Sequence, residues 1–163
     1  MTLTIRPATR ADDDAVWTML EPVFRAGDTY AIDPDIPRDD ALAYWFGPER
    51  RVFLAQDGGE ALGTYYMVRN QKGGGSHVCN CGYITAPAAR GRGVARAMLA
   101  HSLDAAPGFG FRAMQFNFVV STNSRAIATW EGAGFDIVGR LPGAFRHPQQ
   151  GYVDALVMFR PLV

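Results

Sequence analysis

The sequence predicts an α/β domain of the α+β type, with about four helices packed on a mixed, mainly antiparallel sheet of seven strands. The chain has 163 residues and 48% of them are hydrophobic, which suits one core and a single domain over residues 1–163. Short β-forming segments alternate with turns that contain Gly or Pro. One strand–helix–strand unit interrupts them, and such a unit normally joins two parallel strands by a right-handed crossover.

The helices are predicted from apolar spacing and from their end signals. Thr9 begins the first helix as an N-cap, with Asp12 three positions later, and Pro22 is expected to kink or end that helix early. Gly47-Pro48 closes a second, short helix, and Pro107-Gly108 stops a third. The helices are therefore expected at residues 9–24, 39–46, 90–105 and 123–131.

Each predicted strand is a β-forming run between turn residues. Asp57-Gly58-Gly59-Glu60 joins two of the strands as a hairpin, and residues 142–151 are expected to form a loop between the last two. The strands are expected at residues 2–6, 51–56, 61–69, 77–85, 113–120, 135–141 and 152–159. The parallel pair is predicted for the strands on either side of the helix at residues 90–105.

Charge and composition exclude several classes of protein. Lys+Arg and Asp+Glu both number 16, which argues against a protein that holds nucleic acid by bulk charge. No run approaches the roughly 20 apolar residues of a membrane span, and the start of the chain lacks a secretory hydrophobic region, so we expect a cytoplasmic protein. Lys72 is the single lysine and does not lie in a phosphate-binding loop. Cys79 and Cys81 lack further ligands at zinc spacing, so we expect buried, reduced thiols and no metal.

The segment of residues 83–96 places a Gly-rich turn at the start of a helix, directly after a strand. Gly91 and Gly93 allow backbone N–H groups to approach an anion closely, and the helix dipole adds partial positive charge. Arg90, Arg92 and Arg96 add full positive charges. A pyrophosphate is the expected ligand. The sequence does not match the dinucleotide-binding motif, because Arg96 stands where that motif requires Gly or Ala.

Two blocks of the chain resemble the GCN5-related N-acetyltransferase family. Arg90-x-x-Gly93-x-Ala95 is similar to its acyl-CoA signature, and residues 123–135 are similar to its Asn-x-x-Ala…Tyr-Glu-x-x-Gly-Phe block. The resemblance implies direct transfer of an acetyl group from acetyl-CoA to an amine, and dimers are common in the family, so a homodimer is also an expectation. The residues that it implies for acetyl-CoA binding are Tyr83, Ile84, Thr85, Arg90, Gly91, Arg92, Gly93, Val94, Ala95, Arg96 and Asn123.

Two positions depart from the pattern of many family members. Trp130 stands where they carry a Tyr that protonates the leaving thiolate, and Phe118 stands where they carry a Glu base. The usual acid and base therefore cannot be carried over. A thiol with a pKa near that of Cys, about 8.5, leaves readily as a thiolate, and the amine can lose its proton to water.

The acceptor side is predicted around two amides, Asn80 and Asn117, which lie in the middle of strands where Asn is disfavoured. Either they position a small polar amine, or they satisfy a bulge or a buried backbone group. Together with Thr122-Asn123 and residues 139–143, they resemble the yeast-type acetyltransferases of proline analogues and their bacterial relatives. That likeness implies a small amino or imino acid as acceptor.

Other parts of the acceptor side remain open at this point. The candidates for the pocket are Tyr30 and its loop, Tyr65, Tyr66 and the Arg146-His147-Pro148 loop, whereas His101 is expected to face solvent. The alternatives to a small-molecule acetyltransferase are an acetyltransferase of protein or peptide N-termini and a non-catalytic acyl-CoA-binding module.

Overall fold

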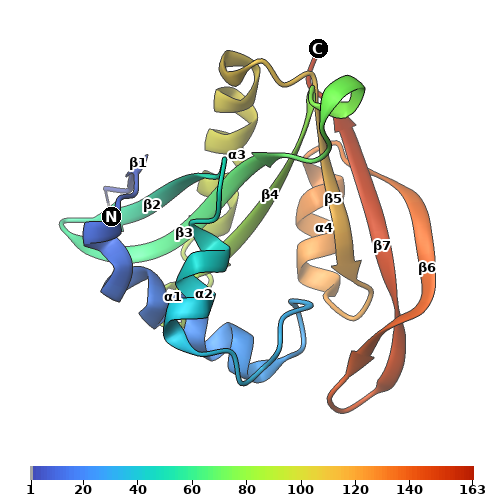
Figure 1. Cartoon of the computed structure of the whole chain (residues 1–163), viewed down its shortest axis with the longest axis horizontal. Coiled ribbons are helices and arrows are strands. Elements are labelled where there is room, and N and C mark those ends of the chain that lie inside the picture. Colours follow the sequence, from blue (N-terminus) through green and yellow to red (C-terminus); the bar gives the residue numbers. More distant parts are fainter. Residues whose placement is uncertain (1) are drawn as a thin grey trace.

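A seven-stranded sheet runs through the computed structural model, which describes residues 2–163 and leaves Met1 outside (Figure 1). Its strand order is β1-β2-β3-β4-β5-β7-β6. The strands are β1 (Thr4–Pro7), β2 (Arg51–Asp57), β3 (Glu60–Arg69), β4 (Val78–Thr85), β5 (Ala113–Val120), β6 (Asp136–His147) and β7 (Gly151–Pro161). The pair β4–β5 is parallel and the other neighbours are antiparallel, so the predicted fold class is confirmed.

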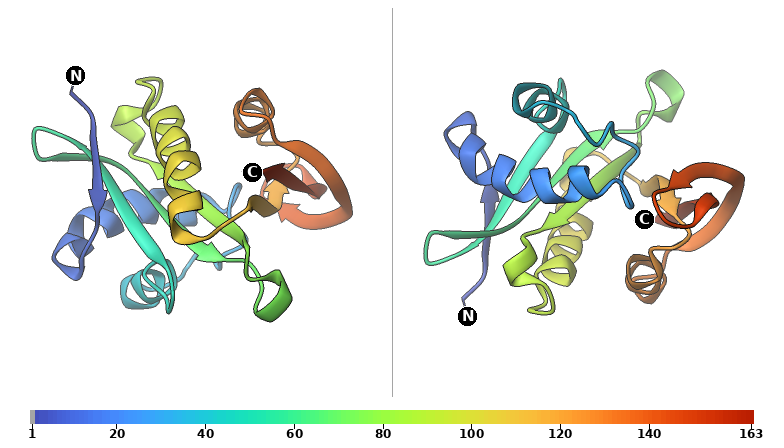
Figure 2. Two further views of the ribbon diagram at one scale, coloured as in Figure 1. Left: turned by 90° about the horizontal axis from the view of Figure 1, so that it is seen from above. Right: turned by 90° about the horizontal axis from the view of Figure 1, so that it is seen from below.

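Helices cover both faces of the sheet (Figure 2). Within the described residues they are α1 (Asp13–Ala26), α2 (Arg38–Trp45), α3 (Val94–Ala105) and α4 (Ser124–Gly132). The apolar faces of α1 and α2 form one buried cluster with β2 and β3, and α3 contributes to a second cluster on the opposite face. Because successive strand residues point to opposite faces, Tyr65 belongs to the second cluster and Tyr66 to the first.

The first helix departs from the prediction at both ends. Thr9 and Asp12 do form a capping box, but they cap a 3-10 turn at Arg10–Asp12, and α1 follows it. The helix then continues past Pro22 and ends at Gly27, which has a left-handed φ of 64°. Early termination at Pro22 is therefore wrong. Burial of Phe24, which follows the proline on the apolar face, favours the continued helix over the propensity of one residue.

The last hairpin is longer than predicted. Strand β6 extends to His147, so the expected loop at residues 142–151 shrinks to residues 148–150. Pro142 is tolerated because β6 is an edge strand, and the register shift between Leu141 and Phe145 absorbs the irregular backbone. The Asp154 carboxylate on β7 fixes this bulge by accepting hydrogen bonds from Gly143 N–H (2.9 Å) and from Arg140 (2.8 Å).

Candidate functional site

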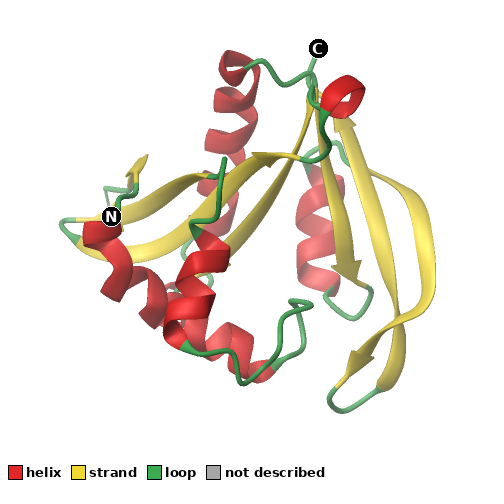
Figure 3. Cartoon of the chain, in the orientation of Figure 1, coloured by secondary structure: helices red, strands yellow, loops and turns green. Residues whose placement is uncertain are grey.

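The parallel strands β4 and β5 separate soon after they meet. Only Val78–Ala113 and Cys79–Met114 are paired, and the Asn80 side chain then bridges the strands by donating Nδ2–H to the carbonyl oxygen of Gln115 at 2.9 Å. A bulge in β5 between Phe116 and Val119 widens the separation. The diverging strands are visible in Figure 3, where the loop between α1 and α2 lies near the open end of the gap. A cavity of about 1070 Å³ occupies this region.

Most of the residues predicted for the site line this one cavity. They are Asn80, Tyr83, Ile84, Thr85, Arg90, Gly91, Gly93, Val94, Ala95, Arg96, Asn117 and Asn123. Arg92 is the exception and does not line it. The structure thus brings together segments that are far apart in sequence, while the assignment of each residue to a bound molecule remains a prediction.

One end of the cavity, the turn end, is formed by residues 90–96 at the start of α3. Gly91 and Gly93 have φ values of 77° and 80°, and space around both is open. The predicted helix begins at Arg90, whereas α3 begins at Val94. The left-handed conformation of the two glycines explains this later start. The first helical hydrogen bond comes from Ala97 N–H to the Gly93 carbonyl at 3.0 Å, so the preceding N–H groups of the first turn are left for a ligand. With Arg90 and Arg96 this end suits an anion.

The middle of the cavity is aromatic. Trp130 packs against Tyr83 and Phe116, with ring centroids 5.3 and 4.8 Å away, and Phe118 also lines the wall. The Tyr83 hydroxyl lies 2.6 Å from Ser102 Oγ on α3, and burial raises the pKa of Tyr83 well above its ordinary value. This phenol is therefore neutral near pH 7 and does not replace the base that is missing at Phe118. Its hydroxyl is engaged by Ser102 and Met114.

The opposite end of the cavity, the loop end, is lined by Asp28, Thr29, Tyr30, Ala31, Tyr44 and Tyr66. The Tyr30 hydroxyl donates a hydrogen bond to the Tyr83 carbonyl oxygen (3.1 Å), which ties the α1–α2 loop to β4. Tyr66 Oη lies 3.4 Å from Asn80 Oδ1. Among the described residues that line the cavity, Asp28 is the one carboxylate.

The two predicted amides already have protein partners. Asn80, half-buried, bonds Gln115 and Tyr66. Asn117 is exposed rather than buried; its Nδ2 donates to Asn70 Oδ1 at 2.6 Å and its Oδ1 accepts from Gln115 at 2.9 Å. Asn80 therefore braces the splayed strands, whereas Asn117 links β5 to Asn70, the residue after β3, and a further role of either toward an acceptor stays a hypothesis.

Several other expectations are resolved by the fold. Tyr65 points away from the cavity toward α3, where its hydroxyl lies 2.6 Å from His101 Nδ1, so the expectation that His101 faces solvent is wrong. Arg146 is exposed and does not line the cavity. Cys79 and Cys81 are buried, free thiols, as predicted. Asp28 lines the cavity and belongs to the Tyr30 loop that was predicted for the pocket. Arg125, within the 123–135 block, and Tyr44 also line it although neither was predicted as a site residue.

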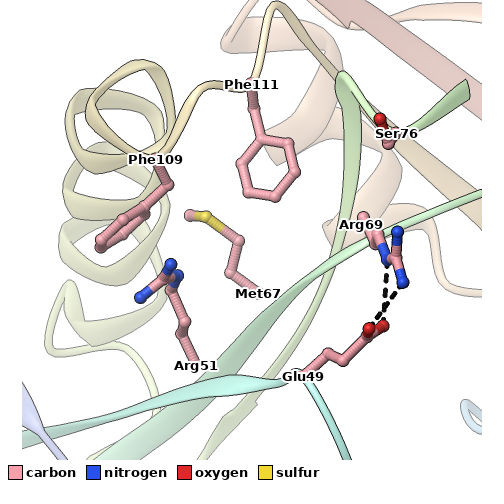
Figure 4. A pocket seen from close by; sticks show the side chains of 7 residues that line it. All are labelled: Glu49, Arg51, Met67, Arg69, Ser76, Phe109 and Phe111. Atoms are coloured by element: carbon pink, nitrogen blue, oxygen red, sulfur yellow. Dashed lines mark hydrogen bonds and ion pairs between the residues drawn. The ribbon is translucent and has the colours of Figure 1, made fainter. Parts of the chain in front are cut away.

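A second cavity, of about 360 Å³, lies apart from these residues (Figure 4). Its charges are largely engaged: Arg69 forms a two-pronged pair with Glu49 at 2.6 and 3.0 Å, and the Arg51 guanidinium stacks on Phe109 at 4.0 Å. Across residues 2–163, no group of three or more His, Cys, Asp or Glu side chains could hold a metal ion. No helix in that range has the length and apolar character needed to cross a membrane.

Comparison with known proteins decides the family. The model of the acetyltransferase (GNAT) family matches residues 14–135, three quarters of the chain. The chain belongs to this family. The first of the two sequence blocks that suggested the GNAT resemblance runs from the turn at Arg90 into α3, and the second begins at Asn123, directly before α4. Residues of both blocks line the cavity.

Individual proteins similar to this GNAT chain support the same family assignment. It is 42% identical to a GCN5-related N-acetyltransferase from Kribbella flavida, with a TM-score of 0.92 over 98% of this chain and 97% of that one. It is 32% identical to the N-acetyltransferase aca1 of Schizosaccharomyces pombe, over 80% of this chain and 71% of that protein, which fits the predicted yeast-type likeness. A phosphinothricin acetyltransferase from Sinorhizobium meliloti, solved in complex with AcCoA, shares the fold at 21% identity (TM-score 0.84; 99% and 89% covered).

Proposed function

We propose that this GNAT chain uses acetyl-CoA to acetylate the amine of a small molecule, with an amino or imino acid as the acceptor. One observation carries the proposal: a single cavity joins an anion-binding helix start, a gap between parallel strands and a tyrosine-rich end. The first two suit the pyrophosphate and the extended arm of acetyl-CoA, and the third suits a small polar acceptor.

The residues present fit acetyl-CoA. The left-handed Gly91 and Gly93 leave open space above the first turn of α3, where a phosphate can approach N–H groups, and Arg90 and Arg96 supply charge. The edge of β4 that faces β5 has no strand partner at Tyr83–Thr85, so its backbone groups, other than the Tyr83 carbonyl bonded by Tyr30, can meet the pantetheine arm. Asn123 lines the same gap. When bound, acetyl-CoA supplies an activated acetyl group as a thioester.

The chain's own contribution to the reaction is mainly to position the reactants. Trp130, Phe116 and Phe118 line the middle of the cavity with aromatic surface and provide no ionised group. The acceptor therefore reacts as the neutral amine, whose nitrogen attacks the thioester carbon while the C–S bond breaks. The amine proton passes to water, and the thiolate leaves without a dedicated acid because its conjugate thiol has a pKa of about 8.5.

The proposal is tested by following free thiol release from acetyl-CoA across amino acids, proline analogues, polyamines and short peptides. We expect turnover with small amino or imino acids that exceeds turnover with peptides. Turnover confined to peptides would assign the chain to N-terminal acetylation instead. Binding of acetyl-CoA without turnover of any amine would make it a non-catalytic acyl-CoA-binding module, and would refute the proposed activity.

A further inference from the structure

The loop end of the cavity has a positive charge built into its wall. Arg50 lies just before β2, and its guanidinium carbon is 4.4 Å from the centroid of the Tyr44 ring and 4.0 Å from that of Tyr66. Both rings line the cavity, whereas Arg50 itself does not. Such stacking on two aromatic faces holds the guanidinium in place by cation–π attraction.

This charge has no counterion within the described chain. None of the ion pairs formed within residues 2–163 includes Arg50. Its Nη1 is buried and is the one buried side-chain nitrogen or oxygen of that range without a hydrogen-bond partner. Because a guanidinium stays protonated in proteins, the fold keeps a full, uncompensated charge here. Native structures rarely leave such a group unpaired without a reason.

The field of Arg50 reaches the groups that face the cavity. Burial raises the pKa of Tyr30 and of Tyr66, and in both cases the positive charge of Arg50 opposes that rise. Tyr30 and Tyr66 are the residues whose hydroxyl groups bond β4 at the Tyr83 carbonyl and at Asn80. The Asp28 carboxylate lines the same cavity.

We infer that Arg50 makes this enzyme selective for amines that also carry a carboxylate, the class of α-amino and α-imino acids. The inference rests on the proposed function. An amine without a carboxylate arrives as a cation and is repelled by the guanidinium. A zwitterion supplies the missing counter-charge to Arg50 from across the Tyr44–Tyr66 wall, with its carboxylate at the positive ring edges rather than over the negative ring faces, and its ammonium group toward Asp28. Arg50 is thus a specificity residue and not a catalytic one.

Matched pairs of acceptors test the inference. The value of kcat/KM is compared for an amino acid and its carboxamide, for example proline and prolinamide. Each value is divided by the fraction of the acceptor that is neutral amine at the assay pH. For the wild type we expect the carboxylate to be preferred at least tenfold, which corresponds to about 1.4 kcal/mol. Arg50→Met, which keeps an apolar chain over the rings, should reduce the preference to less than threefold, and Arg50→Lys should retain part of it.

The neighbouring residue offers a matched control. Arg51→Met also removes an arginine that stacks on an aromatic ring, but that ring, Phe109, belongs to the second cavity (Figure 4). It should leave the preference unchanged. Turnover without a carboxylate preference in the wild type would overturn this inference alone. An unchanged preference in Arg50→Met, with both acceptors slowed equally, would also overturn it and make Arg50 a packing residue. No turnover of any amine would overturn the proposed function as well.

Discussion

A single methyl group at Gly82 should disturb the acceptor side while sparing acetyl-CoA binding. Gly82 lies in β4, where the side chains of Tyr66 and Tyr30 pack against the strand. A Cβ atom built there would be 2.4 Å from Tyr66 Cε2, 2.8 Å from Tyr66 Cζ and 3.0 Å from Tyr30 Oη. Because carbon atoms pack at about 3.5–4.0 Å, the Tyr66 ring would have to retreat by roughly 1 Å.

The surroundings leave little room for that retreat. Tyr66 is buried, and its ring has Trp45 edge-on at 4.9 Å and the Arg50 guanidinium at 4.0 Å. Overpacking of this kind costs about 1–3 kcal/mol. At roughly 2–4 °C per kcal/mol for a chain of this size, Gly82→Ala should lower Tm by about 2–12 °C. Displacement of the loop end by about 1 Å should lower kcat/KM for the acceptor by up to about a hundredfold.

The assay combines melting curves, acceptor kinetics and calorimetry with acetyl-CoA. The affinity for acetyl-CoA should stay within about threefold of the wild type, because the phosphate-binding turn at residues 90–96 is unaltered and Gly82 adjoins only the pantetheine-binding edge at Tyr83. Gly74→Ala is the matched control, since its Cβ would meet nothing within 4 Å. If Gly82→Ala kept wild-type Tm and acceptor kinetics, the close packing of Tyr66 and Tyr30 on β4 would not describe the protein in solution.

Three further predictions concern pH and the amides. For each acceptor, kcat/KM should rise with pH and level off above the pKa of that amine. An inflection at one pH shared by all acceptors would instead reveal a base on the enzyme. Asn80→Ala and Asn117→Ala should each lower acceptor kcat/KM about a hundredfold if the amides position the amine, whereas lower Tm with intact kcat/KM would leave them as braces of the strands. Hydrogen bonding from Arg6 holds the pKa of Asp12 below its usual value, so this carboxylate stabilises the fold above about pH 4 and the contribution is lost as pH falls through its folded pKa. Asp12→Asn should therefore lower Tm near neutral pH more than near pH 3, and equal losses at both would contradict the pairing.

Local signals in the sequence predict the seven strands, apart from the length of β6, and the glycine turn at the turn end. The glycines at 91 and 93 and the arginines around them predict an anion site without knowledge of the tertiary structure, because a helix start binds anions through its own backbone. The crossover rule likewise predicts the parallel pair of β4 and β5. Only the exact start of α3 needed the observed φ values of the glycines.

The loop end could not be predicted in the same way. Tyr44, Tyr66, Arg50 and Asp28 come from separate elements and meet only after the α1–α2 loop packs on β4. The exposure of Asn117 depends on the β5 bulge, which no residue type in the sequence predicts. Local propensity also misjudged Pro22 and Pro142, since burial of α1 and the edge position of β6 outweigh it.

If the turn before α3 binds acetyl-CoA, calorimetric titration of Gly93→Asp should reveal the loss of that binding. The substitution places a carboxylate where the first-turn N–H groups meet phosphate. Gly59→Asp is the matched control, because its φ of 90° is similar to the 80° of Gly93 and both have open surroundings. We predict that Gly93→Asp weakens acetyl-CoA binding well over tenfold, beyond about 1.4 kcal/mol, while Gly59→Asp binds as the wild type. Unchanged affinity in folded Gly93→Asp would contradict the account.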